Sequence, residues 1–217
     1  MTFVVSEECI QLGLRAGAVV LSNVRIETAS PALRQEIAHE VQAVREQLAG
    51  PSAVRANPEV AGFREMLRRA GVNLRRDQPS VERLLAFALK RGDLPTVNSL
   101  VDAYNLVSIR RRCSLGAHDL DTIALPVALR LLTGRESFRP LGRDTAEAVV
   151  TGEFGYVDAQ DRVLCRLDVL QANFSKVTAA TTNAPLIIEG TAAHAEAVEL
   201  VQRYCGGTAE VAAFPNA

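Results

Sequence analysis

Apolar residues recur at helical spacing over much of the first half of the chain. After Ser30 and Pro31, a pair typical of a helix N-terminus, apolar side chains follow one another at intervals of three and four over residues 33–48, and Gly50 and Pro51 end the pattern. This spacing predicts an amphipathic helix with one buried stripe. The same signals predict three more helices, which open at Asn57–Pro58, Pro79 and Leu94–Pro95 and end near Gly71, Gly92 and Arg110.

Shorter apolar stretches at both ends of the chain predict β-strands. Residues 2–26 alternate loosely around Gly13 and Gly17, which favours two or three short strands. A last helix is predicted over residues 192–204, before Gly206. Strands on either side of a helical half predict an α+β domain whose sheet is assembled from both ends of the chain. Further strands are predicted at residues 123–131, 148–150, 154–157, 163–167 and 186–188.

Composition and charge exclude several classes of protein. The chain has 217 residues, of which 48% are hydrophobic, so it can form a core, and disorder is excluded as its main state. The formal net charge is −1, so we do not expect a protein that coats nucleic acid through its overall charge, and we expect no DNA partner. Apolar runs such as residues 123–129 are too short to span a membrane, and the N-terminus has no basic signal region. We expect a single domain over residues 1–217, cytoplasmic and without a membrane partner.

Metal and cofactor sites have no support in the sequence. The four cysteines lie far apart and form no Cys-x-x-Cys pair, so we interpret them as buried free thiols. The three histidines have no spacing that would complete a zinc site. Motifs for a serine hydrolase elbow, a P-loop, a dinucleotide fold and a zinc metalloprotease are absent from the sequence. We therefore expect no metal and no cofactor.

Positive charge is concentrated in the middle of the chain. Residues 60–112 carry 11 Lys and Arg against 5 Asp and Glu, whereas residues 113–217 carry 8 against 13. One interpretation is a solvated helical face with arginines at a helix C-terminus, where the helix dipole favours cations. The other is a local patch that contacts phosphates, for which the arginine fork is well suited. The candidates for RNA contact are Arg75, Arg76, Arg110, Arg111 and Arg112.

Residues 94–110 carry an unusual row of short polar side chains. At about 100° per residue, Val97, Leu100, Val101, Tyr104 and Val107 fall in one arc that we expect to face the core. Asparagine and aspartate are weak helix formers, so a row of them suggests either a structural hydrogen-bond network or the wall of a pocket. The row, in an adjoining arc, consists of Asn98, Asp102 and Asn105.

Two further polar residues could share such a pocket. His118 follows Gly116 in the loop after this helix and could titrate, donate a hydrogen bond or only cap the loop. Glu153 follows Gly152 at the start of a predicted strand, where it could hold a ligand or be a surface acid.

Several stretches of the chain together resemble a known family. They are residues 94–108, 116–120, 134–142, 152–158, 165–166 and 178–182. Through them the chain resembles the B3/B4 domain family, which includes the editing domain of the phenylalanyl-tRNA synthetase beta chain and small freestanding proteins. The resemblance is strongest over residues 70–190, and the chain is similar to a freestanding member. It implies a β-sandwich-like core flanked by helices.

The resemblance also implies an activity. In the synthetase this pocket hydrolyses the ester between a wrong amino acid, tyrosine, and the tRNA 3′ end, without a metal or a covalent nucleophile, because the ester is already activated. By position, Asn105 matches the asparagine of the family's Val-Asp-x-x-Asn segment, and Glu153 matches the acid that reads the amino-acid side chain. Many bacterial synthetase chains place histidine where this sequence has Gly116, so the resemblance does not carry tyrosine over as the amino acid recognised here.

Three hypotheses for function follow. The first is a deacylase that acts in trans on a mischarged tRNA, binding its acceptor end and the attached amino acid. Asn98, Asp102 and Asn105 would shape its pocket, Glu153 would read the amino acid, and His118 would orient water or ligand. The second is a non-catalytic module that binds tRNA, an amino acid or a related metabolite. The third is an interaction domain that contacts a protein partner through its sheet.

Overall fold

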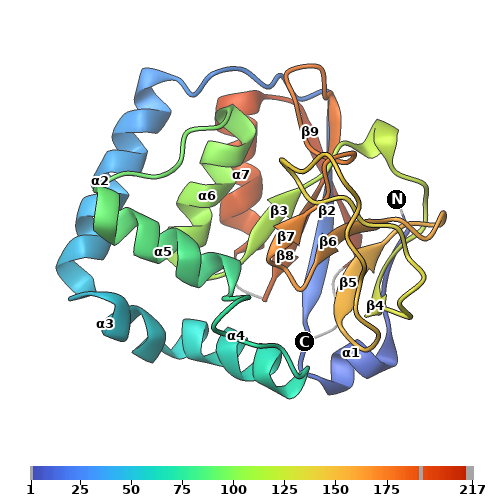
Figure 1. The fold of residues 1–217 in the computed structure, drawn as a ribbon. Helices are drawn as coiled ribbons and strands as arrows, with labels where there is room; N and C mark the ends of the chain where they lie inside the picture. Colours follow the sequence, from blue (N-terminus) through green and yellow to red (C-terminus); the bar gives the residue numbers. More distant parts are fainter. Residues whose placement is uncertain (1, 191–192, 214–217) are drawn as a thin grey trace.

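Two β-sheets stack face to face, and helices cover the outer face of one of them (Figure 1). The computed structural model describes residues 2–190 and 193–213. The first sheet has the order β1 (Phe3–Val5), β4 (Val127–Leu131), β5 (Phe154–Val157), β6 (Val163–Arg166) and β7 (Leu170–Gln171). The second has the order β3 (Leu115–Ala117), β8 (Asn183–Glu189), β2 (Ala16–Ser22) and β9 (Thr208–Ala213).

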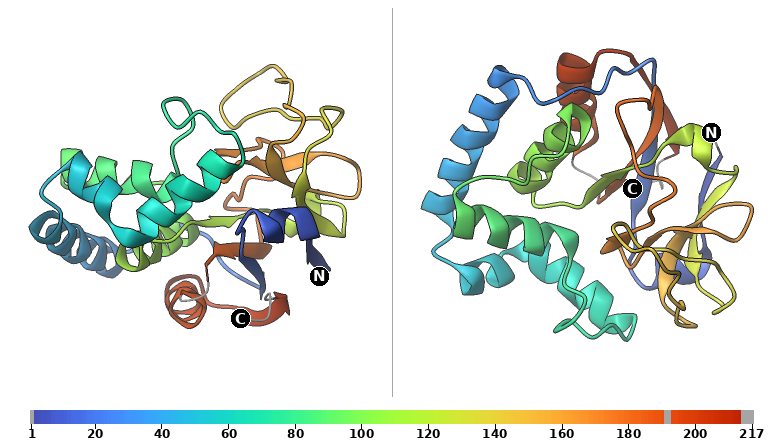
Figure 2. Two further views of the ribbon diagram at one scale, coloured as in Figure 1. Left: turned by 90° about the horizontal axis from the view of Figure 1, so that it is seen from below. Right: turned by 45° about the horizontal axis from the view of Figure 1, so that its top comes forward.

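The helices come mainly from the first half of the chain. They are α1 (Glu7–Gln11), α2 (Pro31–Gln47), α3 (Pro51–Ala56), α4 (Pro58–Arg69), α5 (Ser80–Arg91), α6 (Ser99–Arg111) and α7 (His194–Cys205), with a 3-10 turn at Leu120–Thr122. Figure 2 shows from two further directions that α2 to α6 gather on one side of the strands.

Strand alternation places the four-stranded sheet in the middle of the molecule. On β2, Val19 and Leu21 pack against the helices, while Ala16 and Ala18 belong to the core between the two sheets. Because side chains alternate along a strand, β2 contributes side chains to two hydrophobic cores, one on each face of its sheet. The small alanine side chains allow the five-stranded sheet to pack closely on this face.

The fold class predicted from the sequence is confirmed. The structure is α+β, with a sandwich-like pair of sheets flanked by helices. The middle sheet is assembled from both ends of the chain, because β2 pairs antiparallel with both β8 and β9. Helix α2 begins after Ser30, whose Oγ accepts a hydrogen bond of 3.2 Å from the Leu33 amide. Helix α5 ends at Gly92, whose φ of 71° is the left-handed conformation of a helix C-cap.

The fourth predicted helix begins later than the sequence suggests. Asn98 has an extended backbone and is the N-cap, and its Oδ1 accepts a hydrogen bond of 2.9 Å from the Val101 amide. Val97 therefore lies before the helix, and it is 61% exposed, which corrects its predicted place in the core. The capping asparagine, rather than Pro95, sets the start of α6.

Several short elements were not predicted. The break at Gly50 and Pro51 ends α2 but also starts α3, because proline is well tolerated in the first turn of a helix. Residues 148–150 do not form a strand. Within the part of the chain that the structure describes, no helix is long and apolar enough to cross a membrane. The other unpredicted elements are α1, β3, β7 and β9.

Candidate functional site

A cavity of about 310 Å³ lies between α5, α6, β3 and the turn that joins β6 to β7. Helix α6 packs against both α5 and β3 (Figure 1). Its wall combines apolar side chains with hydroxyl, amide and guanidinium groups, as in small-molecule sites. The lining residues are Ser80, Val81, Arg83, Leu84, Phe87, Pro95, Asn105, Ser108, Leu115 and Val169.

The hydroxyl of Ser80 connects this cavity to a carboxylate behind it. Ser80 is the first residue of α5, and its Oγ lies 2.8 Å from Ser114 Oγ and 3.1 Å from Oδ2 of Asp168. Asp168 adjoins Val169, which itself lines the cavity. A carboxylate thus lies one hydroxyl away from the cavity, within the reach that proton transfer requires.

Asp168 occupies a constrained backbone position. Leu167 and Asp168 have φ values of 57° and 55°, the left-handed region that residues other than glycine rarely adopt. Hydrogen bonds on both sides hold this turn, from the Leu167 amide to Phe154 O and from the Val169 amide to Arg166 O, each 3.0 Å. Such conformations occur where the surrounding structure fixes them, often at functional sites.

Burial raises the pKa of Asp168 to about 7, although the Ser114 and Ser80 hydroxyls oppose this effect. Burial and the charge of Asp168 also raise the pKa of Glu189, at the end of β8, well above its usual range. A carboxyl that titrates near neutrality can take up and return a proton during a reaction. Asp168 is therefore the strongest candidate for acid and base chemistry near the cavity.

Asn105 is the member of the predicted polar row that lines this cavity. It lies on α6, one turn before Ser108, which lines the cavity as well. The Asn105 amide can donate and accept hydrogen bonds, and both residues face the side of the cavity opposite α5.

The other two members of the row stabilise the start of α6 instead. Asn98 caps the helix, as described above. Asp102 is fully buried, and its Oδ1 accepts a hydrogen bond of 2.9 Å from the Val97 amide. Neither Asn98 nor Asp102 lines the cavity that Asn105 lines, so the structure does not bring the three residues together at this wall. Short polar side chains compete for nearby backbone amides, and the first turn of a helix offers such amides.

His118 is part of the core rather than of the cavity wall. It is only 3% exposed, and its Nδ1 lies 2.9 Å from Ser175 Oγ. Burial lowers the pKa of this imidazole to about 4, so it is neutral at pH 7. The histidine thus connects the end of β3 to the loop before β8.

Glu153 lies in a separate ionic cluster. Its Oε2 is 3.2 Å from Arg166 Nε and its Oε1 is 3.8 Å from Arg76 Nη2. Both arginines also approach Asp77, with Arg76 Nε at 2.7 Å and Arg166 Nη2 at 3.6 Å from Oδ2. These contacts hold the loop after α4 to the five-stranded sheet, and the structure does not bring Glu153 to the wall of the cavity that holds Asn105.

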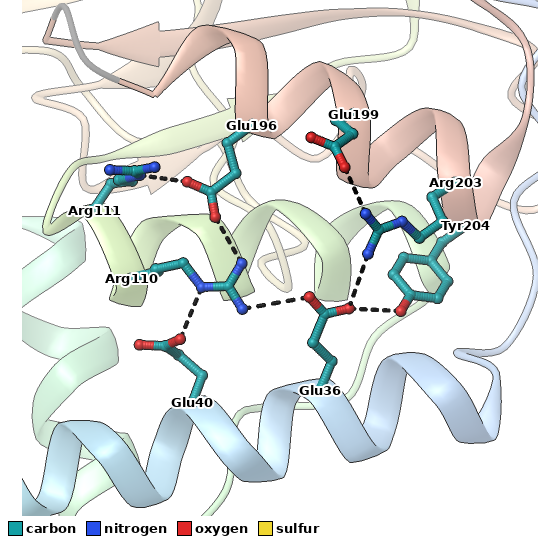
Figure 3. Close-up of polar contacts among 8 residues, drawn as sticks. All are labelled: Glu36, Glu40, Arg110, Arg111, Glu196, Glu199, Arg203 and Tyr204. Carbon is teal, nitrogen blue, oxygen red and sulfur yellow. Dashed lines mark hydrogen bonds and ion pairs between the residues drawn. The ribbon is translucent and has the colours of Figure 1, made fainter.

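Arg110 joins three helices in one ionic network (Figure 3). Its guanidinium lies 2.6 Å from Glu196 of α7, and 2.8 Å from Glu40 and 3.4 Å from Glu36 of α2. Burial alone would lower the pKa of Arg110, but the hydrogen bonds to Glu196 and Glu40 outweigh it and raise the pKa. Arg111 pairs with Glu196 as well. These residues hold α2, α6 and α7 together.

The five arginines predicted to contact RNA therefore have different surroundings. Arg112 is buried, and its Nη2 donates a hydrogen bond of 3.0 Å to Gln47 Oε1. Arg110 and Arg112 are used inside the protein, which does not favour a role on an RNA backbone, whereas Arg111 is half exposed. Arg75 and Arg76 are exposed, in the loop before α5.

Ser80, Ser108 and Asp168 were not predicted as site residues from the sequence. Ser80 follows Pro79, which the sequence marked only as a helix start. Asp168 follows a predicted strand, and nothing in its local sequence shows that the chain turns there into a left-handed conformation against α5. Among the described residues, no cluster of three or more His, Cys, Asp or Glu could hold a metal ion.

Comparison with known proteins identifies the family. Residues 62–205 match the model of the B3/4 domain, which is well over half of the chain. The chain belongs to the B3/4 domain family. No curated protein matches it significantly.

A similar solved structure is the crystal structure of an N-terminal fragment of the phenylalanyl-tRNA synthetase beta-subunit from Pyrococcus horikoshii. The TM-score is 0.48 at 14% sequence identity, and the match covers 96% of this chain and 50% of that chain. This chain thus spans about half the length of that fragment.

Proposed function

We propose that this protein is a hydrolase that removes an amino acid from a mischarged tRNA, with its active site in the cavity beside Asn105. The observation that carries the proposal is the hydrogen bond from Ser80 to Asp168, which places a carboxyl with a pKa of about 7 one hydroxyl away from the cavity. Membership of the B3/4 domain family supports the same class of substrate.

The reaction needs one attacking water and one proton carrier. In the proposed step, water in the cavity attacks the ester carbonyl while its proton passes to the Ser80 oxygen, and the Ser80 proton passes to ionised Asp168. The tetrahedral intermediate then collapses. The proton returns by the same route to the departing 3′ oxygen of the tRNA, so that the free amino acid and the free tRNA end are formed.

The opposite wall supplies groups for the developing negative charge. Asn105 and Ser108 can both donate hydrogen bonds, and fixed donors stabilise an oxyanion better than mobile water does. Because an aminoacyl ester is already reactive, positioning and these donors are sufficient without a metal.

The surface near the cavity is suited to the acceptor end of an RNA. Arg83 and Phe87 line the cavity from α5, and both are exposed. Phe87 offers a ring on which a terminal base can stack, and Arg83 offers a cation for phosphate. Arg75 and Arg76 precede this helix and extend the positive surface.

The test is release of amino acids from a panel of mischarged tRNAs. We expect the wild-type protein to release at least one of them well above the buffer rate. Asp168→Asn should reduce this rate at least about a hundredfold, because general base catalysis typically contributes that much. Asp144→Asn is the matched control and should retain full activity, because Asp144 is exposed and does not line the cavity.

If no ester is released above the buffer rate, the hydrolase proposal is wrong. Binding of tRNA or of an amino acid without any release would favour the non-catalytic module instead. Equal activity in the Asp168 variant would exclude the proton route through Ser80.

A further inference from the structure

A second cavity, of about 430 Å³, lies between α4, the end of α6, the end of β8 and the loop before β2. Its wall includes the apolar side chains of Leu14, Phe63 and Met66. It shares no lining residue with the cavity proposed for hydrolysis. Its remaining lining residues are Gly13, Arg15, Glu59, Gly62, Arg111, Arg112, Cys113, Glu189 and Gly190.

Two buried residues in this wall, Arg112 and Glu189, each have one side-chain atom without a hydrogen-bond partner among the residues that the structure describes. Arg112 is 8% exposed and Glu189 is 3% exposed. Within the described part of the chain, Nη1 of Arg112 and Oε2 of Glu189 have no hydrogen-bond partner. An unsatisfied buried polar atom is costly and rare in a native protein, and it often marks a site that a ligand completes.

The two residues are held in place by their other contacts. Arg112 caps α6 with a φ of 56°, and its Nη2 is fixed by Gln47. Glu189 accepts a hydrogen bond of 2.5 Å from the Tyr156 hydroxyl. The Glu189 amide donates a hydrogen bond of 2.9 Å to Ser114 O, two residues after Arg112, so the end of β8 lies beside the segment that follows α6.

The Arg112 guanidinium is a donor and the Glu189 carboxyl an acceptor, yet the atoms Nη1 and Oε2 of these two described residues do not pair with each other. A ligand that satisfies both must offer an anionic acceptor to the arginine and a donor to the glutamate. The apolar side chains beside them require an apolar body.

We propose that this second cavity binds an α-amino acid with an apolar side chain, whose carboxylate pairs with Arg112 and whose ammonium group pairs with Glu189. The side chain of the amino acid lies against Leu14, Phe63 and Met66. The site differs from the hydrolytic cavity and does not depend on its activity.

Binding should release a proton. Burial and the charge of Asp168 raise the pKa of Glu189 well above its usual range, which favours the protonated form of this carboxyl. An ammonium group beside it favours the ionised form, and the proton that Glu189 loses passes to the buffer. Calorimetry in two buffers of different ionisation enthalpy measures this proton directly.

The experiment titrates L-leucine, 4-methylpentanoate and 3-methylbutylamine into the full chain. The second compound lacks the amino group and the third lacks the carboxylate. We expect L-leucine to bind at least about tenfold more tightly than either, with uptake of a proton by the buffer. Absence of L-leucine binding, or equal binding of the three compounds, overturns the proposal.

Variants of the lining residues test whether L-leucine binds in this second cavity. Arg112→Met and Glu189→Gln should each weaken L-leucine binding at least about tenfold, and the second should also abolish proton release. Gly62 offers a variant that keeps the fold, because a Cβ at this helical position meets no atom within 4 Å. Gly62→Leu fills the cavity and should abolish binding, while Arg68→Leu, on the exposed face of the same helix, should leave it unchanged.

Failure of this proposal is distinguishable from failure of the hydrolase proposal. Asn105→Ala should leave L-leucine binding unchanged, and Gly62→Leu should leave the release of amino acids from tRNA unchanged. If Asn105→Ala removes L-leucine binding while Gly62→Leu does not, the amino acid binds in the first cavity and the second site is excluded.

Discussion

Ser80 Oγ donates a hydrogen bond of 3.1 Å to Oδ2 of Asp168, a residue 88 positions further along the chain. This bond joins the first turn of α5 to the turn after β6, at the wall of the cavity that also holds Asn105. A proton route of this kind depends on both residues, and each can be tested separately.

Ser80→Ala should slow hydrolysis and shift its pH dependence. Activity requires ionised Asp168, so the wild-type rate should rise with pH and level off above about pH 7. The Ser80 hydroxyl lowers the pKa of Asp168, so its removal should move the midpoint of the rate profile to higher pH. Rates measured between pH 5.5 and 9 check this. Ser52→Ala, at an exposed position, is the control, and an unshifted midpoint in Ser80→Ala would contradict the route.

Asp168→Asn should change how stability depends on pH. The folded-state pKa of about 7 is above the ordinary aspartate value of 3.8, so the folded protein holds this proton more tightly than the unfolded chain does. The contribution of protonated Asp168 to stability is complete below about pH 4 and is lost as the pH rises through 7. Denaturant unfolding at pH 5 and pH 8 should therefore show a smaller loss of stability in the variant than in the wild type. The same loss in both proteins would argue against a raised pKa.

Glu136→Gln should destabilise the loop after β4. The carboxylate of Glu136 accepts hydrogen bonds from the amides of Thr133, Gly134 and Arg135, and it lies 2.5 Å from Arg130 Nη1. Burial alone would raise its pKa, but these donors outweigh burial and lower the pKa to about 2. The stabilisation is present above about pH 4.5 and is lost as the pH falls through 2.

The expected cost of this substitution at pH 7 is about 3 kcal/mol, because an arginine and several amides lose a charged partner. Urea unfolding at pH 7 and pH 3 measures it. The difference between variant and wild type should become smaller at the lower pH. Glu147→Gln, on the exposed part of the following loop, should change stability by less than about 0.5 kcal/mol.

Arg110→Met should destabilise the fold, because it leaves Glu36, Glu40 and Glu196 facing one another without the cation between them. Removal of one partner from a partly buried network costs about 3 kcal/mol. Arg111→Met is the control. Among the described residues this half-exposed side chain pairs with Glu196 alone, and its loss should cost about 1 kcal/mol or less. A thermal melt measures both. If the two variants melt alike, the network in Figure 3 is not what holds α2, α6 and α7 together.

Two asparagines of α6 should respond in opposite ways. Asn98→Ala removes the N-cap and should cost about 1 kcal/mol of stability while the activity remains. Asn105→Ala, in the cavity wall, should reduce hydrolysis at least about tenfold with little effect on stability. Unfolding and deacylation assays on the same two samples separate the roles. Loss of activity in Asn98→Ala would restore the idea of a continuous polar row.

The amino-acid sequence by itself determined the longer helices and the class of the fold. Apolar residues at helical spacing from Leu33 to Val44, after the N-cap Ser30, predict a helix from the local sequence alone, because capping and amphipathicity are local properties. The sequence pattern also singled out Asn105, and the structure places it at a cavity. The pattern did not separate Asn105 from Asn98, because a polar side chain at helical spacing serves equally as a cap or as a pocket wall.

Tertiary structure alone decided which polar groups meet. Ser80 and Asp168 come together because the β6–β7 turn packs against α5, and no local signal encodes a contact between residues so far apart. Arg110 belongs to a run of three arginines that, from the sequence, could equally bind RNA. Its ion pairs with three carboxylates form only because α2 and α7 pack beside α6. Helix boundaries follow from neighbouring residues, whereas the pKa of a carboxyl and the partner of an arginine follow from burial and packing between distant segments.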